Sequence, residues 1–227
     1  MSEIREIVLD TETSGLRIRD GHRIIEIGCV ELKNKRRTGR SYQAYVNPQR
    51  GIDAEAMRVH GIASEFLQDK PLFSQIARDF LQFIGNSRLV IHNAAFDISF
   101  INYELAICGL PTITNDRVVD TLLMARKKYP GSPASLDSLC KRFAVSLETR
   151  NKHGALVDAE LLASVYIIMN GATQVEIELN RDQGKSDIRK ITQHKRRQFH
   201  LSDAERILHQ EFLKKIKNHL WCTSGSE

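Results

Sequence analysis

The chain has no apolar run long enough to cross a membrane. None of its 227 residues belongs to an uninterrupted stretch of about eighteen apolar side chains, the minimum for a spanning helix. Residues 1–5 also lack the apolar core of a secretory signal peptide. We therefore expect the protein to stay in the compartment where it is made.

Cysteine is scarce and scattered. The four cysteines, Cys29, Cys108, Cys140 and Cys222, lie far apart, and none belongs to a Cys-x-x-Cys motif. The spacing does not indicate a structural zinc site or a dithiol redox site, so we expect free thiols. The sequence also lacks internal repeats and low-complexity tracts, which argues against a solenoid.

What is present is the composition of an ordinary globular protein, with 41% apolar and 27% charged residues. The net charge of +5 is unevenly placed, because residues 180–227 hold eleven Lys and Arg against six Asp and Glu. A basic tail is compatible with binding to nucleic acid or to an acidic partner. It is equally compatible with a merely soluble extension.

The order of the predicted elements indicates an α/β fold. Apolar runs and alternating patterns predict strands at residues 7–9, 23–32, 41–46, 89–93 and 118–120. The polar residues 33–39 predict the turn between the second and third strands. Because the first three strands have short links, we expect a mixed sheet in which three antiparallel strands are followed by parallel strands.

Helices are expected where apolar residues recur with the helical period. They cover about residues 73–84, 95–108, 121–128, 135–143 and 155–170. Shorter helices are expected after residue 53, where Asp53 and Ser64 are suited to be N-caps. The helices would flank the sheet.

The chain changes character after Gly171. Residues 172–200 are polar with little apolar periodicity, which predicts a linker. Residues 201–227 begin with a capping box at Ser202 and Glu205 and continue with an apolar stripe. One helix cannot bury such a stripe alone, so it must pack on the domain or on a partner. We thus predict a domain at residues 1–171, a linker and an amphipathic C-terminal helix.

Asp10 and Glu12 follow the first predicted strand and lie two residues apart. Side chains with this spacing project to the same side of a strand. Two close carboxylates repel each other unless a cation neutralises them, and Mg²⁺ and Mn²⁺ prefer such hard oxygen ligands. The alternative is that Asp10 caps the following loop and Glu12 is a solvated surface charge.

Two further acids, Asp97 and Asp158, fall in the first turns of predicted helices, and His153 precedes the second of them. Each acid alone would be explained by the favourable field at a helix N-terminus. His153 alone would be an ordinary loop residue. Together with Asp10 and Glu12, these residues make a set of four acids and one histidine.

This set resembles the motifs of the DEDDh family of 3′-to-5′ exonucleases, whose fold is ribonuclease-H-like. The family pattern is an Asp-x-Glu pair, a central Asp, and a His that precedes the last Asp by five residues. Segments that look like the proofreading subunits of bacterial DNA polymerase III are residues 7–13, 23–28, 59–63 and 92–97. The resemblance covers residues 5 to about 170.

The resemblance implies two Mg²⁺ or Mn²⁺ ions per site. Asp10, Glu12 and Asp158 would bind one ion, Asp10 would bridge to the second, and Asp97 would act through coordinated water. Two ions about 4 Å apart can activate a water molecule and stabilise the leaving oxygen. His153 would be the general base. It should lie on the loop before its helix and be mobile until substrate binds.

The resemblance also implies contacts with the terminal nucleotide. The substrate-binding residues would be Asp10, Thr11, Glu12, Thr13, Glu55, His60 and Asp158. Phe96 is suited either to stacking on a base or to core packing. Without the resemblance, Glu55 would be a charge on a helix surface and His60 a loop histidine.

The implied function is proofreading of a single-stranded or mispaired 3′ end of DNA, with release of nucleoside monophosphates. The protein would work in the bacterial cytoplasm, with the nucleoid during replication. Residues 201–227 would dock on the catalytic subunit of DNA polymerase III and raise the effective concentration of the enzyme. Residues 174–179 lie where the family carries a peptide that binds the sliding clamp.

Two other functions are compatible with the sequence. The chain would be a free-standing DNA-repair or RNA-trimming exonuclease of the same family if the tail served only solubility or dimerisation. It would be a non-catalytic subunit if it only bound nucleic acid or polymerase. The four converging acids argue against this last function, because they would repel a phosphate backbone.

Overall fold

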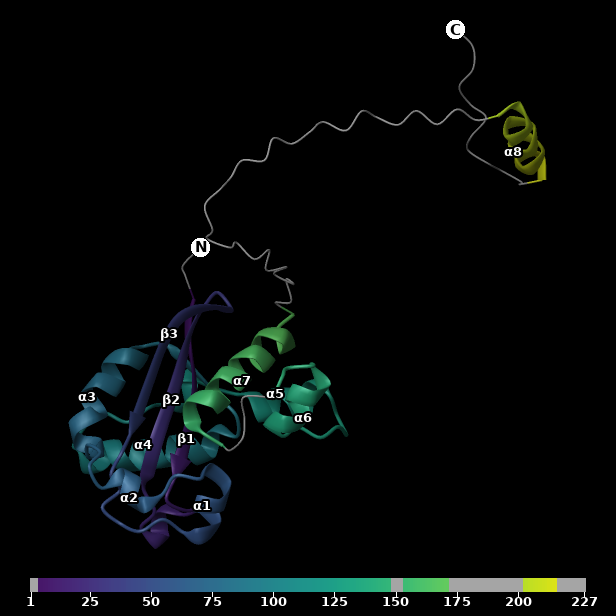
Figure 1. Cartoon of the computed structure of the whole chain (residues 1–227). Helices are drawn as coiled ribbons and strands as arrows, with labels where there is room; N and C mark the ends of the chain where they lie inside the picture. Colours follow the sequence, from purple (N-terminus) through teal and green to yellow (C-terminus); the bar gives the residue numbers. More distant parts are fainter. Residues whose placement is uncertain (1–3, 148–152, 172–201, 216–227) are drawn as a thin grey trace, which may run out of the picture. The chain divides into compact units, whose positions relative to one another are not determined.

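The computed structural model describes residues 4–147, 153–171 and 202–215 (Figure 1). The chain divides into two units, Met1–Glu176 and Ile177–Glu227. The first unit contains a sheet and the helices that cover it, and the described part of the second unit is a single helix. Among the described residues, no helix combines the length and the apolar character that a bilayer span requires.

A five-stranded sheet forms the centre of the first unit, with the strand order β3-β2-β1-β4-β5. Strands β1, β2 and β3 pair antiparallel, whereas β4 runs parallel to β1 and β5 runs parallel to β4. This arrangement confirms the predicted mixed sheet. The strands are β1 (Arg5–Thr13), β2 (Ile24–Lys33), β3 (Arg36–Tyr45), β4 (Arg88–Ile91) and β5 (Val118–Asp120).

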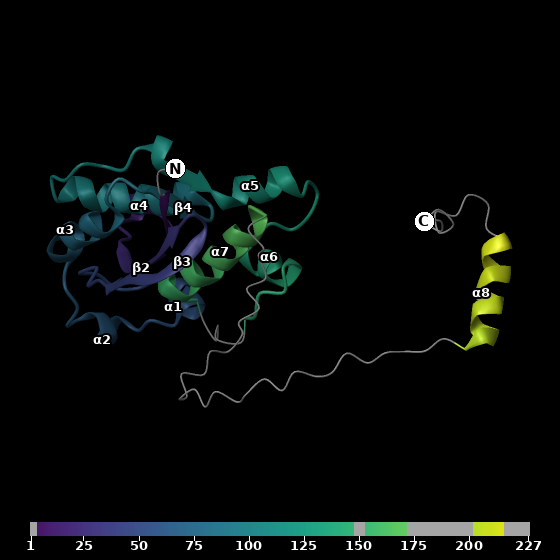
Figure 2. The ribbon, with the colours of Figure 1, turned by 90° about the horizontal axis from the view of Figure 1, so that it is seen from above.

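Helices cover both faces of the sheet (Figure 2). They are α1 (Ala54–His60), α2 (Ser64–Leu67), α3 (Phe73–Ile84), α4 (Ala94–Ile107), α5 (Thr121–Lys128), α6 (Leu136–Arg142) and α7 (Ala155–Met169), with short 3₁₀ helices at Ile18–Asp20 and Asn115–Arg117. In β1, Ile7 and Leu9 pack in one core with α3 and α4, while Val8 packs in a second core with α7. The alternation of side chains along β1 thus joins the two cores.

The turn between β2 and β3 is shorter than predicted. Asn34 and Lys35 have φ values of 50° and 62°, and Lys33 pairs with Arg36 on either side of them. A two-residue turn with both φ values positive matches the right-handed twist of a hairpin. The prediction of a turn over residues 33–39 was wrong because β3 is an edge strand whose charged side chains face solvent.

Of the two predicted caps, Asp53 occupies the N-cap position of α1, and Ser64 does not cap α2. Asp53 precedes α1, but its side chain makes no cap hydrogen bond and instead lies 3.2 Å from Nε2 of His22. Ser64 is the first residue of α2, and Ala63 occupies the cap position. In the first case a more distant partner competes for the carboxylate, which a local pattern does not reveal.

The described part of the second unit is helix α8 (Asp203–Lys215). Its capping box forms as expected, because the Glu205 amide donates to Oγ of Ser202 at 3.3 Å and the Ser202 amide donates to Glu205 at 2.8 Å. Three apolar side chains on this helix are 58 to 65% exposed: Ile207, Leu208 and Phe212. The predicted linker at residues 172–200 lies outside the described residues.

Candidate active site

The predicted site lies where the parallel strands end. Because β1, β4 and β5 run in the same direction, their carboxyl ends meet at one edge of the sheet. Helix α4 begins at Ala94, shortly after β4 ends, and α5 begins directly after β5. Ligand sites in open α/β sheets commonly lie at this edge.

Strand β1 places Asp10 and Glu12 on one face of the sheet. The strand continues through Thr13, beyond the predicted residues 7–9, so that the two acids lie within a paired strand. Both acids are partly exposed, whereas Thr11 and Thr13 between and after them are buried. The ladder with β2 therefore fixes the direction of both carboxylates.

Helix α4 brings Asp97 next to the carboxyl end of β1. The pairing of β1 with β4 stops at Val8, and beyond it Oδ1 of Asp97 accepts hydrogen bonds from the Thr11 amide at 3.0 Å and the Thr11 hydroxyl at 2.6 Å. The Asp97 side chain is buried, and burial raises its pKa to about 7, although the Thr11 bonds oppose that rise. Asp97 is thereby joined to the strand that carries Asp10 and Glu12.

Helix α7 supplies Asp158 from its first turn, and His153 lies on the loop just before that helix, as predicted. Nδ1 of His153 lies 3.0 Å from Oδ2 of Asp158. Asp158 is buried, whereas the histidine side chain is 42% exposed. The structure therefore brings His153, Asp158 and Glu12 together, with ligand atoms within 4.8 Å of one another.

Helix α1 lies beside this cluster and carries Glu55 and His60. The segment before α1 is bonded to the residue after β1, because the Asp53 amide donates to the Ser14 carbonyl at 2.9 Å. In the last turn of α1, the Val59 carbonyl accepts a hydrogen bond from the His153 amide at 3.4 Å. Glu55 is 84% exposed and lines a cavity of about 350 Å³. His60 is buried, not a loop residue, and its Nδ1 accepts from the Ile62 amide at 2.9 Å.

Three other predicted residues make contacts within the protein. The Thr11 hydroxyl binds Asp97, and the Thr13 hydroxyl donates to the Gly15 carbonyl at 2.7 Å. The ring of Phe96 lies 5.0 Å from the ring of Phe100, at the margin of the core that contains α4. For Phe96, this packing favours the core interpretation over stacking on a base.

Sequence reasoning missed two carboxylates near the site, Glu26 and Asp120. Glu26 of β2 accepts from the first amide of α7, and Asp120 at the end of β5 accepts from the first amide of α4. The available signal was weak: Glu26 is an acid inside the apolar run of β2, and such a residue must find a polar partner when buried.

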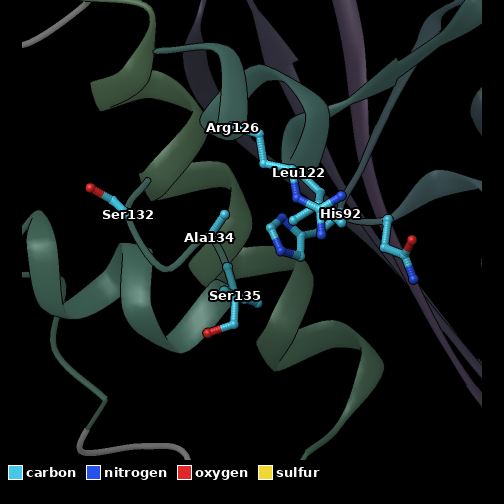
Figure 3. Close-up of a pocket in the computed structure, with 8 residues that line it drawn as sticks. His92, Leu122, Arg126, Ser132, Ala134 and Ser135 are labelled. Atoms are coloured by element: carbon cyan, nitrogen blue, oxygen red, sulfur yellow. The ribbon is translucent and has the colours of Figure 1, made fainter. Parts of the chain in front are cut away.

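A separate polar cavity of about 560 Å³ lies between the end of β4, α5 and the segment before α6 (Figure 3). Its lining includes His92 and Arg126. Nδ1 of His92 lies 2.9 Å from the Thr121 hydroxyl, and burial lowers the pKa of His92. None of the predicted site residues lines this cavity.

The clustered side chains fit a divalent cation. Carboxylate oxygens and an imidazole nitrogen are suitable ligands, and the oxygens in particular suit Mg²⁺ and Mn²⁺. The raised pKa of Asp97 reflects the cost of a buried negative charge, which a nearby cation would offset. Glu12 and Asp158 of the cluster are therefore candidate ligands, and Asp10, which projects from the same face of β1 as Glu12, is the third.

Comparison with known proteins identifies the family of the chain. The RNase_T exonuclease family matches residues 7–166. The DNA polymerase III subunit epsilon of Rickettsia felis is 53% identical over 177 residues, which cover 77% of each chain. The corresponding subunit of Escherichia coli K12 is 47% identical over 199 residues, which cover 82% of each chain.

Solved structures show the same architecture. Exonuclease X, in complex with 5′ overhanging duplex DNA, aligns with a TM-score of 0.59 and 26% identity over 74% of this chain and 92% of its own. The nuclease domain of 3′hExo, a DEDDh family member bound to rAMP, aligns with a TM-score of 0.62 at 17% identity over 74% of this chain and 92% of its own. The chain belongs to the RNase_T exonuclease family and, within it, to the epsilon subunits of DNA polymerase III.

Proposed function

We propose that this epsilon subunit removes mispaired nucleotides from the 3′ end of DNA with two Mg²⁺ or Mn²⁺ ions held by Asp10, Glu12, Asp97 and Asp158. The observation that supports the proposal is that Glu12 of β1 and Asp158 of α7 lie beside His153, with ligand atoms within 4.8 Å of one another, while Asp97 of α4 is bonded to Thr11 of the same strand β1. Bound ions of this kind supply an activated water molecule and stabilise a leaving oxygen. The protein residues hold the ions and orient the 3′ end.

His153 is the proposed general base. Its ring is partly exposed and close to the Glu12 and Asp158 carboxylates, so it can reach a water molecule held beside them. In the structure Nδ1 faces Asp158, a contact that orients the ring. His153 then accepts the proton that the attacking water loses.

The terminal nucleotide is proposed to lie between the end of β1 and helix α1. Glu55 is exposed at the cavity there, and His60 is held in place by the Ile62 amide. Thr11 and Thr13 line the buried side of the strand and keep its end rigid through their internal bonds. A paired terminus must open to reach this position, which favours a single-stranded or mispaired end.

We further propose that the second unit docks the enzyme on the catalytic subunit of DNA polymerase III. Ile207, Leu208 and Phe212 give α8 an exposed apolar face, and the basic charge of residues 180–227 suits an acidic surface. Residues 172–200 would be the linker between residues 1–171 and the docking segment at 201–227. Assembly with the polymerase would place the protein in the bacterial cytoplasm, at the nucleoid during replication.

Binding of the sliding clamp by residues 174–179 is a further part of this proposal. These residues lie outside the described part of the chain, and Gln174 with the apolar alternation after it supports the assignment. A Gln174→Ala variant should bind the clamp more weakly than the native chain in a surface-plasmon-resonance titration. Equal affinities would remove the clamp from the list of partners.

The proposed activity is tested with a 5′-labelled primer that carries a 3′ mismatch. The native chain with Mg²⁺ should shorten the primer stepwise from its 3′ end, and EDTA or the Asp10→Ala change should stop the reaction. No shortening of paired DNA, single-stranded DNA or RNA with either metal would reject the catalytic assignment and favour a binding subunit.

A further inference from the structure

The geometry points to Glu26 and Asp120 as positioning residues that hold the two helices carrying Asp158 and Asp97. Each of these carboxylates comes from the sheet and accepts a hydrogen bond from the first amide of its helix. Neither is one of the predicted metal ligands. The inference rests on the proposed metal site and explains how its acids are held in register.

Glu26 is almost completely buried, with 1% of its surface exposed. Oε2 accepts from the Ala155 amide at 3.1 Å, and Oε1 accepts from the side-chain amide of Gln43 at 2.8 Å. A buried carboxylate is costly unless it is hydrogen-bonded, and a helix N-terminus favours a negative charge. Oε2 of Glu26 therefore fixes the start of α7 against β2, and the bond from Gln43 of β3 satisfies Oε1.

The start of α7 also lies in direct contact with the backbone of β2. A Cβ atom built on Gly28 would come within 2.2 Å of the Ala155 backbone. Gly28 is the strand partner of Asp10, and Glu26 is the strand partner of Glu12. The two β2 residues that contact the start of α7 are thus paired with the two β1 acids of the proposed metal site.

Asp120 holds α4 in a similar way. Its carboxylate accepts from the amides of Asn93 at 3.3 Å and Ala94 at 3.1 Å, and it also caps α5 through Leu122 at 2.8 Å. Asn93 adopts a left-handed conformation with φ of 63° where the chain turns from β4 into α4. Asp120 therefore fixes two helix starts to the end of β5.

The two helices share the same spacing between the bonded amide and the site acid. Ala94 and Ala155 are the first residues of α4 and α7, and Asp97 and Asp158 are the fourth residues. Residues three apart lie on the same face of a helix, one turn further along. Because each bonded amide is one turn below its acid, a shift of the helix start displaces the acid with it.

The test compares Glu26→Ala and Glu26→Gln with native full-length chain. Readouts are kcat and KM on a short single-stranded oligonucleotide and the Mn²⁺ dissociation constant by electron paramagnetic resonance, each well below the unfolding temperature of the variant. Glu26→Ala should lower kcat and weaken Mn²⁺ binding about tenfold, as for other residues that orient metal ligands, with little change in KM. Glu26→Gln keeps an acceptor oxygen but removes the negative charge at the helix N-terminus, so it should still lower kcat and Mn²⁺ affinity, by less than tenfold.

Ser135→Ala is the matched control, because Ser135 caps α6 by accepting from the Ser138 amide at 3.3 Å and α6 carries no site acid. It should lower thermal stability and leave kcat and Mn²⁺ affinity unchanged. The same readouts apply to Asp120→Asn, which has one acceptor oxygen in place of the two that bind Ala94 and Leu122 and should also lower kcat and Mn²⁺ affinity.

If Glu26→Ala does not fold, the inference is tested by the kcat and Mn²⁺ affinity of Glu26→Gln. Native kcat and native Mn²⁺ affinity in that variant, or in a folded Glu26→Ala, would overturn the inference. A native chain that neither hydrolyses DNA nor binds Mn²⁺ would instead reject the proposed function itself.

Discussion

Helices α7 and α8 are similar in length but differ in what covers their apolar side chains. In α7, Leu162 is fully buried in the core beneath the sheet, together with Ala159 and Tyr166. In α8, Leu208 is 65% exposed and Phe212 is 60% exposed. A helix that packs on its own sheet can hold a catalytic acid in a fixed place, whereas a helix with an uncovered apolar face is suited to bind a partner.

The largest expected effect is a loss of hydrolysis when α7 is changed at Asp158, with no such loss when α8 is changed. Asp158→Asn removes a negative ligand from the proposed metal site and should lower kcat on a short oligonucleotide by a factor of about 10³ or more. The control is Leu208→Ala in the isolated chain, which should leave this rate unchanged. A comparable loss in both variants would show that the second unit takes part in hydrolysis.

Replacing a leucine by alanine in each helix compares how much α7 and α8 contribute to the free energy of unfolding. Leu162→Ala should destabilise the first unit by about 2–5 kcal/mol, because it leaves a cavity in a packed core. Leu208→Ala removes a side chain that is already exposed and should change the free energy of unfolding of the first unit by less than about 0.5 kcal/mol. Urea denaturation followed by circular dichroism measures both changes. Equal destabilisation would contradict the assigned burial.

The exposed face of α8 predicts the next effect. Phe212→Ala should weaken binding to the polymerase catalytic subunit by about 2 kcal/mol, which is the usual size for a buried aromatic anchor in an interface. Isothermal titration calorimetry with the full chain measures the affinity. The Asp158→Asn variant should bind as tightly as the native chain, and a native affinity in Phe212→Ala would place the docking contact elsewhere.

The smallest expected effect concerns Asp97 in metal-free protein. Burial raises its pKa to about 7 in the folded state, above an unfolded value of about 4. The stability that the protonated form contributes is therefore present below pH 4 and is lost as the pH rises through 7.

In EDTA, the native Tm should accordingly fall between pH 6 and pH 8. Asp97→Asn keeps the oxygen that accepts from Thr11 and has no charge, so its Tm should fall less, by about 3 °C. Differential scanning fluorimetry at the two pH values checks this difference. Parallel Tm changes in native and variant protein would mean that Asp97 does not titrate there.

Local patterns predicted the elements of the first unit, and the family resemblance supplied the candidate site residues, but neither revealed the contacts that fix them. The period of the apolar residues was sufficient to predict the bounds of α5, which agree with the structure. It predicted the bounds of α4 and α7 to within one residue. The motifs named Asp10, Glu12, Asp97, Asp158 and His153; the structure clusters Glu12, Asp158 and His153 and bonds Asp97 to Thr11 of β1.

Contacts between distant residues explain the rest. Glu26 and Ala155 are 129 residues apart in sequence, so no local pattern links the acid of β2 to the start of α7. The same reason accounts for Asp53, where His22 takes the place of the expected helix amide. The hairpin turn at Asn34 was predicted too long because a polar edge strand resembles a loop when only composition is considered.

A Mn²⁺ titration by electron paramagnetic resonance, in the presence of a nucleoside monophosphate, tests the central claim most directly. If acids from β1, α4 and α7 form one metal site, the native chain binds two ions and Asp10→Asn, which removes the proposed bridging ligand, binds fewer than two. Two ions bound by Asp10→Asn with native affinity, or DNA hydrolysis by a native chain that binds none, would contradict the account.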